Sequence, residues 1–157
     1  MTDEELGAGR AEVFGTVFLL AQHLTRRTDA ALDDWGLTSR QWLLLAALQR
    51  GFPDRDPSLS EAAELYGTSR QNVKQIALGL AERGWLRLEP DSADARTTRL
   101  VRTDLVRRFD SAEGRRRTAS LLDDVFAGLP RDDVEVLRRL LARWLQALAP
   151  AGTIPPR

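Results

Sequence analysis

The chain has 157 residues, enough for one well-packed domain and too few for two ordinary ones. Hydrophobic residues make up 43% and charged residues 29%, which indicates a soluble globular protein, and the absence of cysteine excludes disulfides, thiolate metal sites and cysteine-based redox sensing. The formal net charge is zero, but residues 68–103 carry seven basic and four acidic side chains, so positive charge gathers in the middle of the chain. No apolar run is long enough to cross a membrane and the first residues are acidic, so we expect a cytoplasmic protein with no membrane partner.

Two helices are predicted in the first third of the chain. Residues 11–34 place apolar side chains at helical spacing over a broad face. Gly36 ends this helix, and Thr38 or Ser39 caps the next one. The segment 51–57, with its glycine, prolines and aspartates, is predicted to be a loop.

A short helix and a longer one follow, joined by a tight turn. The short helix is predicted over 61–66, opened by Ser58 or Ser60 and stopped by Gly67. Thr68 and Ser69 cap the longer helix, and Thr68 has capping-box spacing with Gln71. Gly84 ends the longer helix, and its buried side is formed by Val73, Ile76, Ala77 and Leu80. Short helix, turn and capped helix together predict a helix-turn-helix unit.

The period of the pattern changes after Gly84. Residues 85–89 alternate and predict a strand, 90–96 are rich in turn residues, and 97–102 predict the returning strand. Two strands joined by a long loop with a basic tip form a wing.

The rest of the chain returns to helical spacing. Helices are predicted over 104–127 and 131–148, and residues 149–157 are predicted to be a disordered tail. The fold class is therefore mainly α with a small β-hairpin wing (α+β): a winged helix-turn-helix with flanking helices at both chain ends. We expect 1–157 to form a single domain, with the DNA-binding region at 37–103 and dimerisation helices at 11–34 and 104–148. The apolar stripes at the two chain ends exceed what one small winged helix covers, which predicts a homodimer.

The exposed face of the helix after Ser69 predicts contact with DNA. With Val73, Ile76 and their neighbours toward the core, Gln71, Lys74 and Gln75 point away from it, flanked by Arg70 and Asn72. Amides pair bidentately with adenine, and arginine or lysine with guanine. An ordinary solvated surface is the simpler alternative, but no carboxylate occurs between Thr68 and Ala81 in a chain with equal numbers of acids and bases.

The wing tip carries Asp94 and Arg96 on either side of Ala95. A tip arginine fits a narrow minor groove, where the potential is most negative, and an aspartate nearby could fix its rotamer. A turn with solvated charges explains the same residues equally well.

The sequence resembles the MarR family of bacterial transcription regulators over about 37–103. The resemblance rests on residues 36–42 (GLTSRQW), 59–73 (LSEAAELYGTSRQNV), 82–86 (ERGWL) and 94–96 (DAR). It implies an interlocked homodimer, the helix after Gly67 in the major groove, and Arg96, oriented by Asp94, in the minor groove. The chain departs from the family at Ala95, where a first arginine is usual, and in residues 103–107, which lack the glycine that usually opens the helix after the wing.

From these patterns we predict a sequence-specific regulator, a repressor, that acts as a homodimer on a pseudo-palindromic operator and is released by a small aromatic ligand. The predicted DNA-binding residues are Arg40, Thr68, Ser69, Arg70, Gln71, Asn72, Lys74, Gln75, Asp94, Arg96 and Arg99. The resemblance implies an effector pocket between the first two helices, the fifth helix and the wing region, where Phe14, Phe18 and Trp42 offer an apolar lining and Arg40 a partner for a carboxylate. A simple core role for the three aromatic side chains is an equal alternative.

Other function classes fit the sequence less well. One histidine, His23, and no cysteine leave little for a zinc site, and no glycine-rich phosphate loop is present, so we expect neither an enzyme nor a cofactor or bound metal. A winged helix that binds another protein instead of DNA is the more serious alternative. Leu78, which points outward from the predicted recognition helix, is the one feature that favours it.

Overall fold

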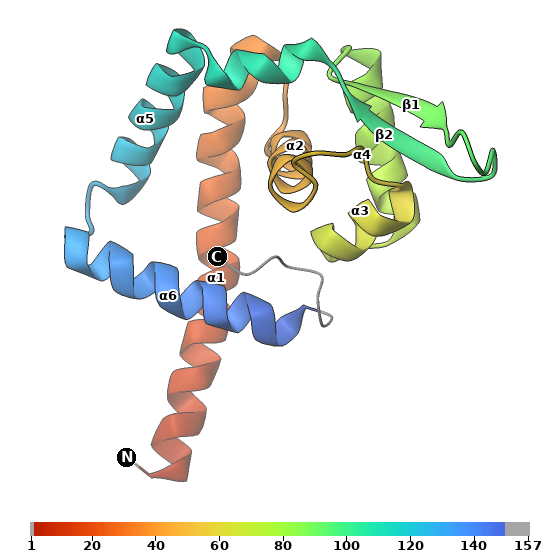
Figure 1. The fold of residues 1–157 in the computed structure, drawn as a ribbon. Coiled ribbons are helices and arrows are strands. Elements are labelled where there is room, and N and C mark those ends of the chain that lie inside the picture. Colours follow the sequence, from red (N-terminus) through yellow and green to blue (C-terminus); the bar gives the residue numbers. More distant parts are fainter. Residues whose placement is uncertain (1, 150–157) are drawn as a thin grey trace. The chain divides into compact units, whose positions relative to one another are not determined.

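The computed structural model describes residues 2–149 and divides into two compact units, residues 1–39 and 40–157. The elements are α1 (Asp3–Leu32), the 3-10 helix η1 (Asp33–Trp35), α2 (Ser39–Gly51), α3 (Leu59–Tyr66), α4 (Arg70–Glu82), β1 (Leu86–Pro90), β2 (Thr98–Arg102), the 3-10 helix η2 (Asp104–Asp110), α5 (Ala112–Phe126) and α6 (Arg131–Leu148). Figure 1 labels the α-helices and the two strands. This mainly helical chain with one antiparallel hairpin confirms the predicted fold class. Apart from Ala149, the predicted tail at 149–157 lies outside the described residues.

The first unit is a long helix with a short 3-10 turn at its end. Helix α1 begins eight residues before the predicted start, because Thr2 and Glu5 form a capping box that the apolar pattern does not reveal. At the other end Gly36 adopts φ 63°, a left-handed conformation that glycine takes without a steric penalty. The carboxylate of Asp29 then accepts a hydrogen bond of 2.6 Å from the amide of Ser39.

The core of the second unit is built by α2, α3, α4 and the hairpin. Helix α3 packs against α4, and α4 packs against β1. The large, fully buried side chains of this core are Trp85, Leu44, Leu45, Leu48, Leu80, Leu86, Leu100 and Val73. Each such aliphatic side chain contributes about 1.5–3 kcal/mol by leaving water. This burial fixes the orientation of α4 and leaves its opposite side in solvent.

The hairpin begins one residue later than predicted at both strands. Its register pairs Leu86 with Arg102 and Pro90 with Thr98. Strand β2 is also held on its other edge, because Ser58 forms an isolated bridge with Arg99 and the amide of Leu100 donates to the carbonyl of Pro57 at 2.9 Å. The segment that leads into α3 is therefore tied directly to the wing.

The predicted single helix over 104–127 is wrong. The segment forms η2 and then α5, because Ser111 has extended backbone (φ −68°, ψ 161°) and its hydroxyl accepts a hydrogen bond from the amide of Gly114. Gly114 therefore lies in the opening turn of the helix after the wing, so the expected departure from the family at residues 103–107 came from placing the start of that helix too early.

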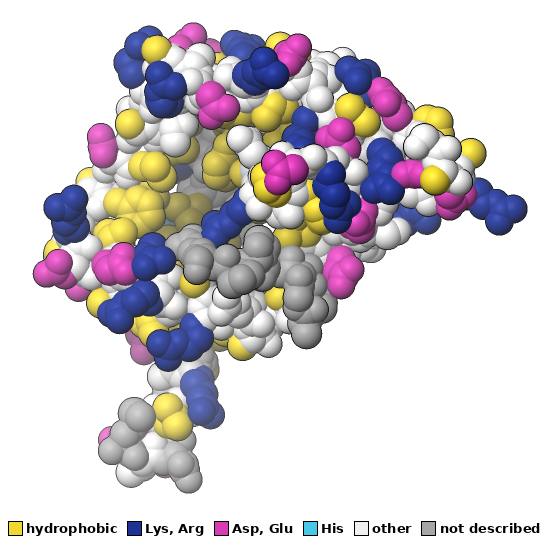
Figure 2. All heavy atoms as spheres, in the orientation of Figure 1, with side chains coloured by type: hydrophobic (Ala, Val, Ile, Leu, Met, Phe, Trp, Pro, Cys, Tyr) yellow, Lys and Arg dark blue, Asp and Glu magenta, His cyan; other side chains and the backbone are white. Residues whose placement is uncertain are grey.

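Helix α6 has the predicted bounds and none of its residues is buried. Leu140, Leu141, Leu145 and Leu148 on this helix are 53%, 42%, 55% and 72% exposed. On α5 and in the turn after it, Leu122, Phe126 and Leu129 are also exposed, and Figure 2 shows hydrophobic side chains at the surface over this part of the chain. These apolar side chains are therefore not part of the buried core of the second unit.

Helices capable of spanning a membrane are absent from the described residues. The same part of the chain holds no cluster of three or more potential metal ligands, and His23 is exposed.

Candidate nucleic-acid interface

The turn between α3 and α4 is built by one glycine and one serine. Gly67 adopts φ 71°, and its amide and that of Thr68 donate to the last turn of α3. Ser69, and not Thr68, is the N-cap of α4: its hydroxyl accepts from the amide of Asn72 at 3.2 Å. The predicted capping box of Thr68 and Gln71 is therefore wrong, and Gln71 is left exposed.

Helix α4 presents the predicted polar face. Val73, Ile76, Ala77 and Leu80 are buried, whereas Arg70, Gln71, Lys74 and Gln75 are exposed. Asn72 is half-buried, and its side-chain amide donates to the hydroxyl of Thr68 at 2.9 Å. Asn72 and Thr68 thus stabilise the start of the helix. The four exposed side chains carry hydrogen-bonding groups of the kind that pair with the edges of DNA bases.

Arg40 lies in the first turn of α2, which is tied to the end of α3. The hydroxyl of Tyr66 donates to the carbonyl oxygen of Arg40 at 3.3 Å. Burial raises the pKa of the Tyr66 phenol, against an opposing effect of the Arg40 charge. The Tyr66 hydroxyl therefore stays protonated and able to donate, and Arg40 is an exposed cation beside the helix-turn-helix.

The wing turn is held by two aspartates. Asp91 Oδ1 accepts from the amides of Ala93 and Asp94 at 2.8 and 3.1 Å. Asp94 accepts from the amide of Arg96 at 3.1 Å and from the hydroxyl of Thr97 at 2.9 Å. Asp94 therefore fixes the backbone amide of Arg96. The sequence had predicted a contact of Asp94 with the Arg96 guanidinium instead. Arg96 itself is exposed, and Figure 2 shows a basic side chain standing out beyond the end of the hairpin.

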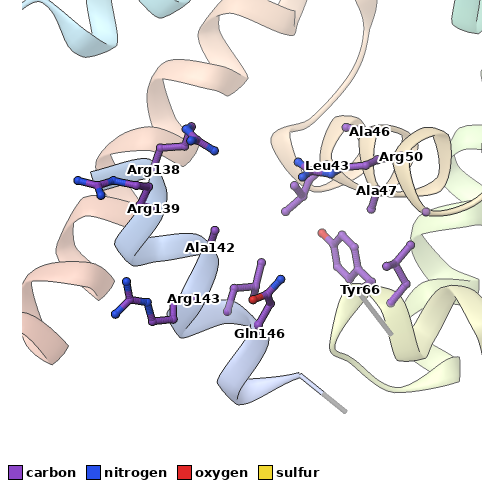
Figure 3. Close-up of a pocket in the computed structure, with 13 residues that line it drawn as sticks. Leu43, Ala46, Ala47, Arg50, Tyr66, Arg138, Arg139, Ala142, Arg143 and Gln146 are labelled. Atoms are coloured by element: carbon purple, nitrogen blue, oxygen red, sulfur yellow. The ribbon is translucent and has the colours of Figure 1, made fainter. Parts of the chain in front are cut away.

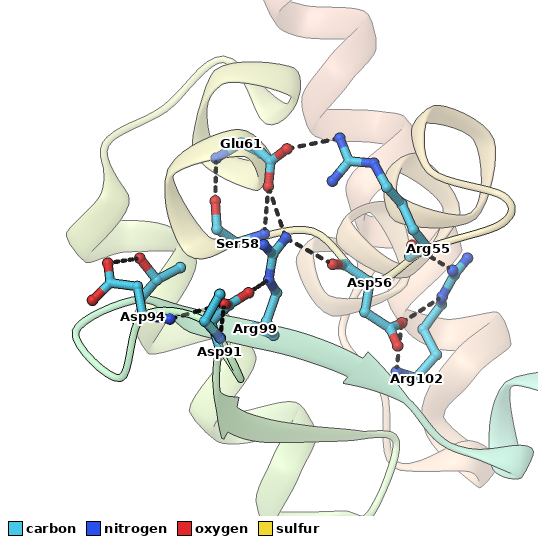
Figure 4. Close-up of polar contacts among 10 residues, drawn as sticks. Arg55, Asp56, Ser58, Glu61, Asp91, Asp94, Arg99 and Arg102 are labelled. Carbon is cyan, nitrogen blue, oxygen red and sulfur yellow. Dashed lines mark hydrogen bonds and ion pairs between the residues drawn. The ribbon is translucent and has the colours of Figure 1, made fainter.

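Arg99 lies on β2 and faces the loop before α3. Its Nε donates to Asp91, and its Nη1 contacts the carbonyl of Asp56 at 3.2 Å and the carboxylate of Glu61 at 3.4 Å (Figure 4). Only 33% of its side chain is exposed. The neighbouring Arg102 donates from Nη2 to the carbonyls of Phe52 and Arg55 at 2.8 and 2.9 Å.

Glu61 is the acidic centre of these contacts. Hydrogen bonds from Arg55, at 2.7 Å, and from Ser58 lower the pKa of Glu61 to about 2, so its carboxylate is ionised at neutral pH. The residues of this cluster that were not predicted from the sequence are Glu61, Arg55, Asp56, Asp91 and Arg102. One signal was available, because Ser58 and Glu61 have the spacing of a capping box, which the structure contains.

The predicted effector residues are not brought into one cavity within either unit. Phe14 and Phe18 form an edge-to-face pair on α1, with ring centroids 5.0 Å apart, and are 60% and 61% exposed. Trp42 is half-buried on α2 in the second unit. The alternative that all three simply fill the core does not hold for the two phenylalanines.

A cavity of about 750 Å³ lies within the second unit, and none of those three aromatic side chains is among the residues that line it. Figure 3 shows α2 and α3 along one side of it and α6 along the other. Apolar side chains such as Leu43 and Leu65 line it together with Arg50 and three arginines of α6.

Residues 35–97 match the family model described as MarR family, from the end of η1 to the wing turn. The resemblance to the MarR family is confirmed. A comparison with curated proteins gives no match.

The chain is also similar to solved structures of this kind over most of its length. A probable transcriptional regulator from Pseudomonas aeruginosa is 21% identical with a TM-score of 0.71, covering 84% of this chain and 96% of its own. The reduced form of MarR from E. coli is 18% identical with a TM-score of 0.67, covering 83% and 93%. Reduced AbfR bound to DNA is 17% identical with a TM-score of 0.64, covering 94% and 99%. These similarities show a MarR-type winged-helix fold. MarR-family proteins regulate transcription and are not enzymes, which agrees with the sequence prediction.

Proposed function

We propose that the chain is a sequence-specific DNA-binding regulator of transcription in the bacterial cytoplasm. The observation that carries this proposal is the exposed side of α4, where Arg70, Gln71, Lys74 and Gln75 stand together without a carboxylate. In the major groove Gln71 and Gln75 would read adenine, while Arg70 and Lys74 would contact guanine or phosphate. Arg96 at the wing tip would enter the adjacent minor groove.

We further propose that the protein acts as a homodimer. Its support is the set of large apolar side chains that α5 and α6 leave exposed, since exposed apolar surface of this kind commonly marks a site of contact with a partner. A two-fold dimer presents two recognition helices to one side of a duplex, and the operator is then pseudo-palindromic. A dimer seated on a promoter excludes polymerase, so repression is the simplest regulatory outcome.

Selection of bound sites from random duplexes, followed by salt titration of the best one, tests the proposal. We expect a pseudo-palindrome with half-sites about 10 base pairs apart, and binding that weakens steeply with salt as counterions are released. Binding of no duplex would refute the proposal. It would favour the protein-binding alternative, for which Leu78, 39% exposed on α4, is the available contact.

We propose that an aromatic acid is the effector that releases the DNA. Two places fit its chemistry: the surface of Phe14 and Phe18 predicted from the sequence, and the arginine-lined cavity of the second unit. By thermodynamic linkage, bound acid must weaken operator binding by the same free energy by which bound operator weakens binding of the acid. We expect this coupling free energy to be about 1–3 kcal/mol. Thermal shift with benzoate and hydroxybenzoates, repeated with operator present, measures both directions.

Two variants distinguish the two places for the effector. Arg50→Gln should abolish the thermal shift if the acid occupies the cavity, and Phe18→Ala if it occupies the surface of Phe14 and Phe18. An acid that stabilises the protein and leaves operator affinity unchanged would show that its site is not a switch.

A further inference from the structure

Arg99 connects three segments that are far apart in the sequence. Its guanidinium contacts Asp91 at the start of the wing turn, the carbonyl of Asp56 in the loop before α3, and Glu61 in α3 (Figure 4). Helix α3 packs against α4, so a group fixed to Glu61 is fixed relative to the recognition helix.

The partner of Arg99 in the wing has a second role. The other oxygen of Asp91 accepts the amides of Ala93 and Asp94, and Asp94 in turn accepts the amide of Arg96. An unbroken series of polar contacts therefore runs from Glu61 through Arg99 and Asp91 to the backbone of Arg96. The amides of Ala93 and Asp94 together with the Arg99 guanidinium lower the pKa of Asp91, so this carboxylate is ionised at neutral pH.

We propose that Arg99 is a positioning residue that sets the wing tip relative to the recognition helix, and that it does not itself contact DNA. This inference rests on the proposed DNA binding and replaces the sequence prediction of a direct contact by Arg99. If the wing is already held at the correct angle, Arg96 and the exposed face of α4 can enter two grooves at once. The entropy cost of ordering the wing on binding is then avoided. Arg99 is suited to this because its planar, forked guanidinium binds several oxygens in a fixed arrangement.

Replacing Asp91 distinguishes positioning from direct contact by the sign of the effect. Asparagine at position 91 keeps a side-chain oxygen for the two turn amides and loses the charge that holds Arg99. If Arg99 contacted a phosphate, Asp91→Asn would strengthen DNA binding, because it removes a negative charge and frees the guanidinium. If Arg99 positions the wing, Asp91→Asn weakens binding although the protein becomes more positive.

The experiment measures operator affinity and its salt dependence for Arg99→Gln and Asp91→Asn, each with Arg96 present and in an Arg96→Ala background. We expect each variant to weaken operator binding roughly tenfold, which is the size of coupling typical of residues in contact. The slope of log affinity against log salt concentration should stay unchanged. In the Arg96→Ala background both effects should disappear, since the residue being positioned is gone. Gln75→Ala is the matched control: the effect of Arg99→Gln should persist fully in that background, because Gln75 lies on α4.

Three results of the binding measurements would overturn the inference. The first is a slope of log affinity against log salt concentration that is smaller by about 0.9 in Arg99→Gln. The others are tighter binding by Asp91→Asn, and a full effect of Arg99→Gln in the Arg96→Ala background. Hydrogen exchange of the free protein separates this inference from the proposed function. In Arg99→Gln the amides of Ala93 and Asp94 should exchange faster, while those of α4 stay protected. Unchanged exchange in the wing turn refutes the positioning role even if operator binding is intact, whereas a wild-type protein that binds no duplex refutes the proposed function and this inference together.

Discussion

Replacing Leu141 with glutamate should convert the proposed dimer into a monomer of 17.6 kDa. Leu141 is 42% exposed in the chain and lies on a helix without any buried residue, so the substitution leaves the core of the second unit intact. In a two-fold interface the new carboxylate is buried twice, and each unpaired buried charge destabilises the dimer by several kcal/mol. Sedimentation at micromolar concentration measures the change of mass.

Loss of the dimer should also reduce operator affinity by about 10²–10⁴-fold, because the second half-site is no longer bound as part of the same particle. Arg139→Glu is the matched control, since it places the same side chain two residues away, on the opposite side of α6. We expect this variant to remain dimeric. A monomeric control, or a Leu141→Glu protein that stays dimeric at micromolar concentration, contradicts the assignment of this face.

The sequence was sufficient where a single periodicity decides the structure. The buried and exposed sides of α4 and the bounds of α6 were both predicted, because a 3.6-residue pattern over three or more turns leaves one orientation for each helix. Helix ends were less well predicted. Thr68 and Ser69 both offer a hydroxyl for the cap, and the left-handed turn at Gly67 selects the second.

The contacts of Arg99 could not be read from local patterns. Arg99 and Glu61 are 38 residues apart, and they meet because the loop before α3 pairs with the edge of β2. From the sequence an arginine on the wing of a winged helix is expected to face DNA, so Arg99 was assigned there together with Arg96. The pairing of segments determines which of the two arginines is free to point outward, and this pairing is a tertiary property.

The start of the helix after the wing was misplaced because it depends on how η2 and α5 pack together. The apolar pattern over 104–127 continues through Ser111, but the backbone there is extended, and the short η2 turn comes before α5. A methyl group added at Gly114 would lie 2.6 Å from the carbonyl oxygen of Phe109, closer than side chains approach backbone atoms. Only glycine allows η2 and α5 to meet this closely.

Gly114→Ala should therefore destabilise the protein by about 2–3 kcal/mol, lowering the melting temperature by roughly 4–12 °C. The backbone at Phe109 must move away from the new methyl group, and this movement disrupts the cap in which the Ser111 hydroxyl accepts from the amide of residue 114. Gly128→Ala is the control, because a side chain there meets no atom within 4 Å and the backbone has no positive φ. Thermal unfolding followed by circular dichroism compares the two variants with the wild type. Equal melting temperatures for both variants would mean that α5 does not pack on η2 in this way. The 3-10 helix η2 joins the wing to the helices of the proposed dimer. Movement of its backbone at Phe109 should therefore change the direction of α5, and we expect Gly114→Ala to weaken operator binding at temperatures where the protein is still folded.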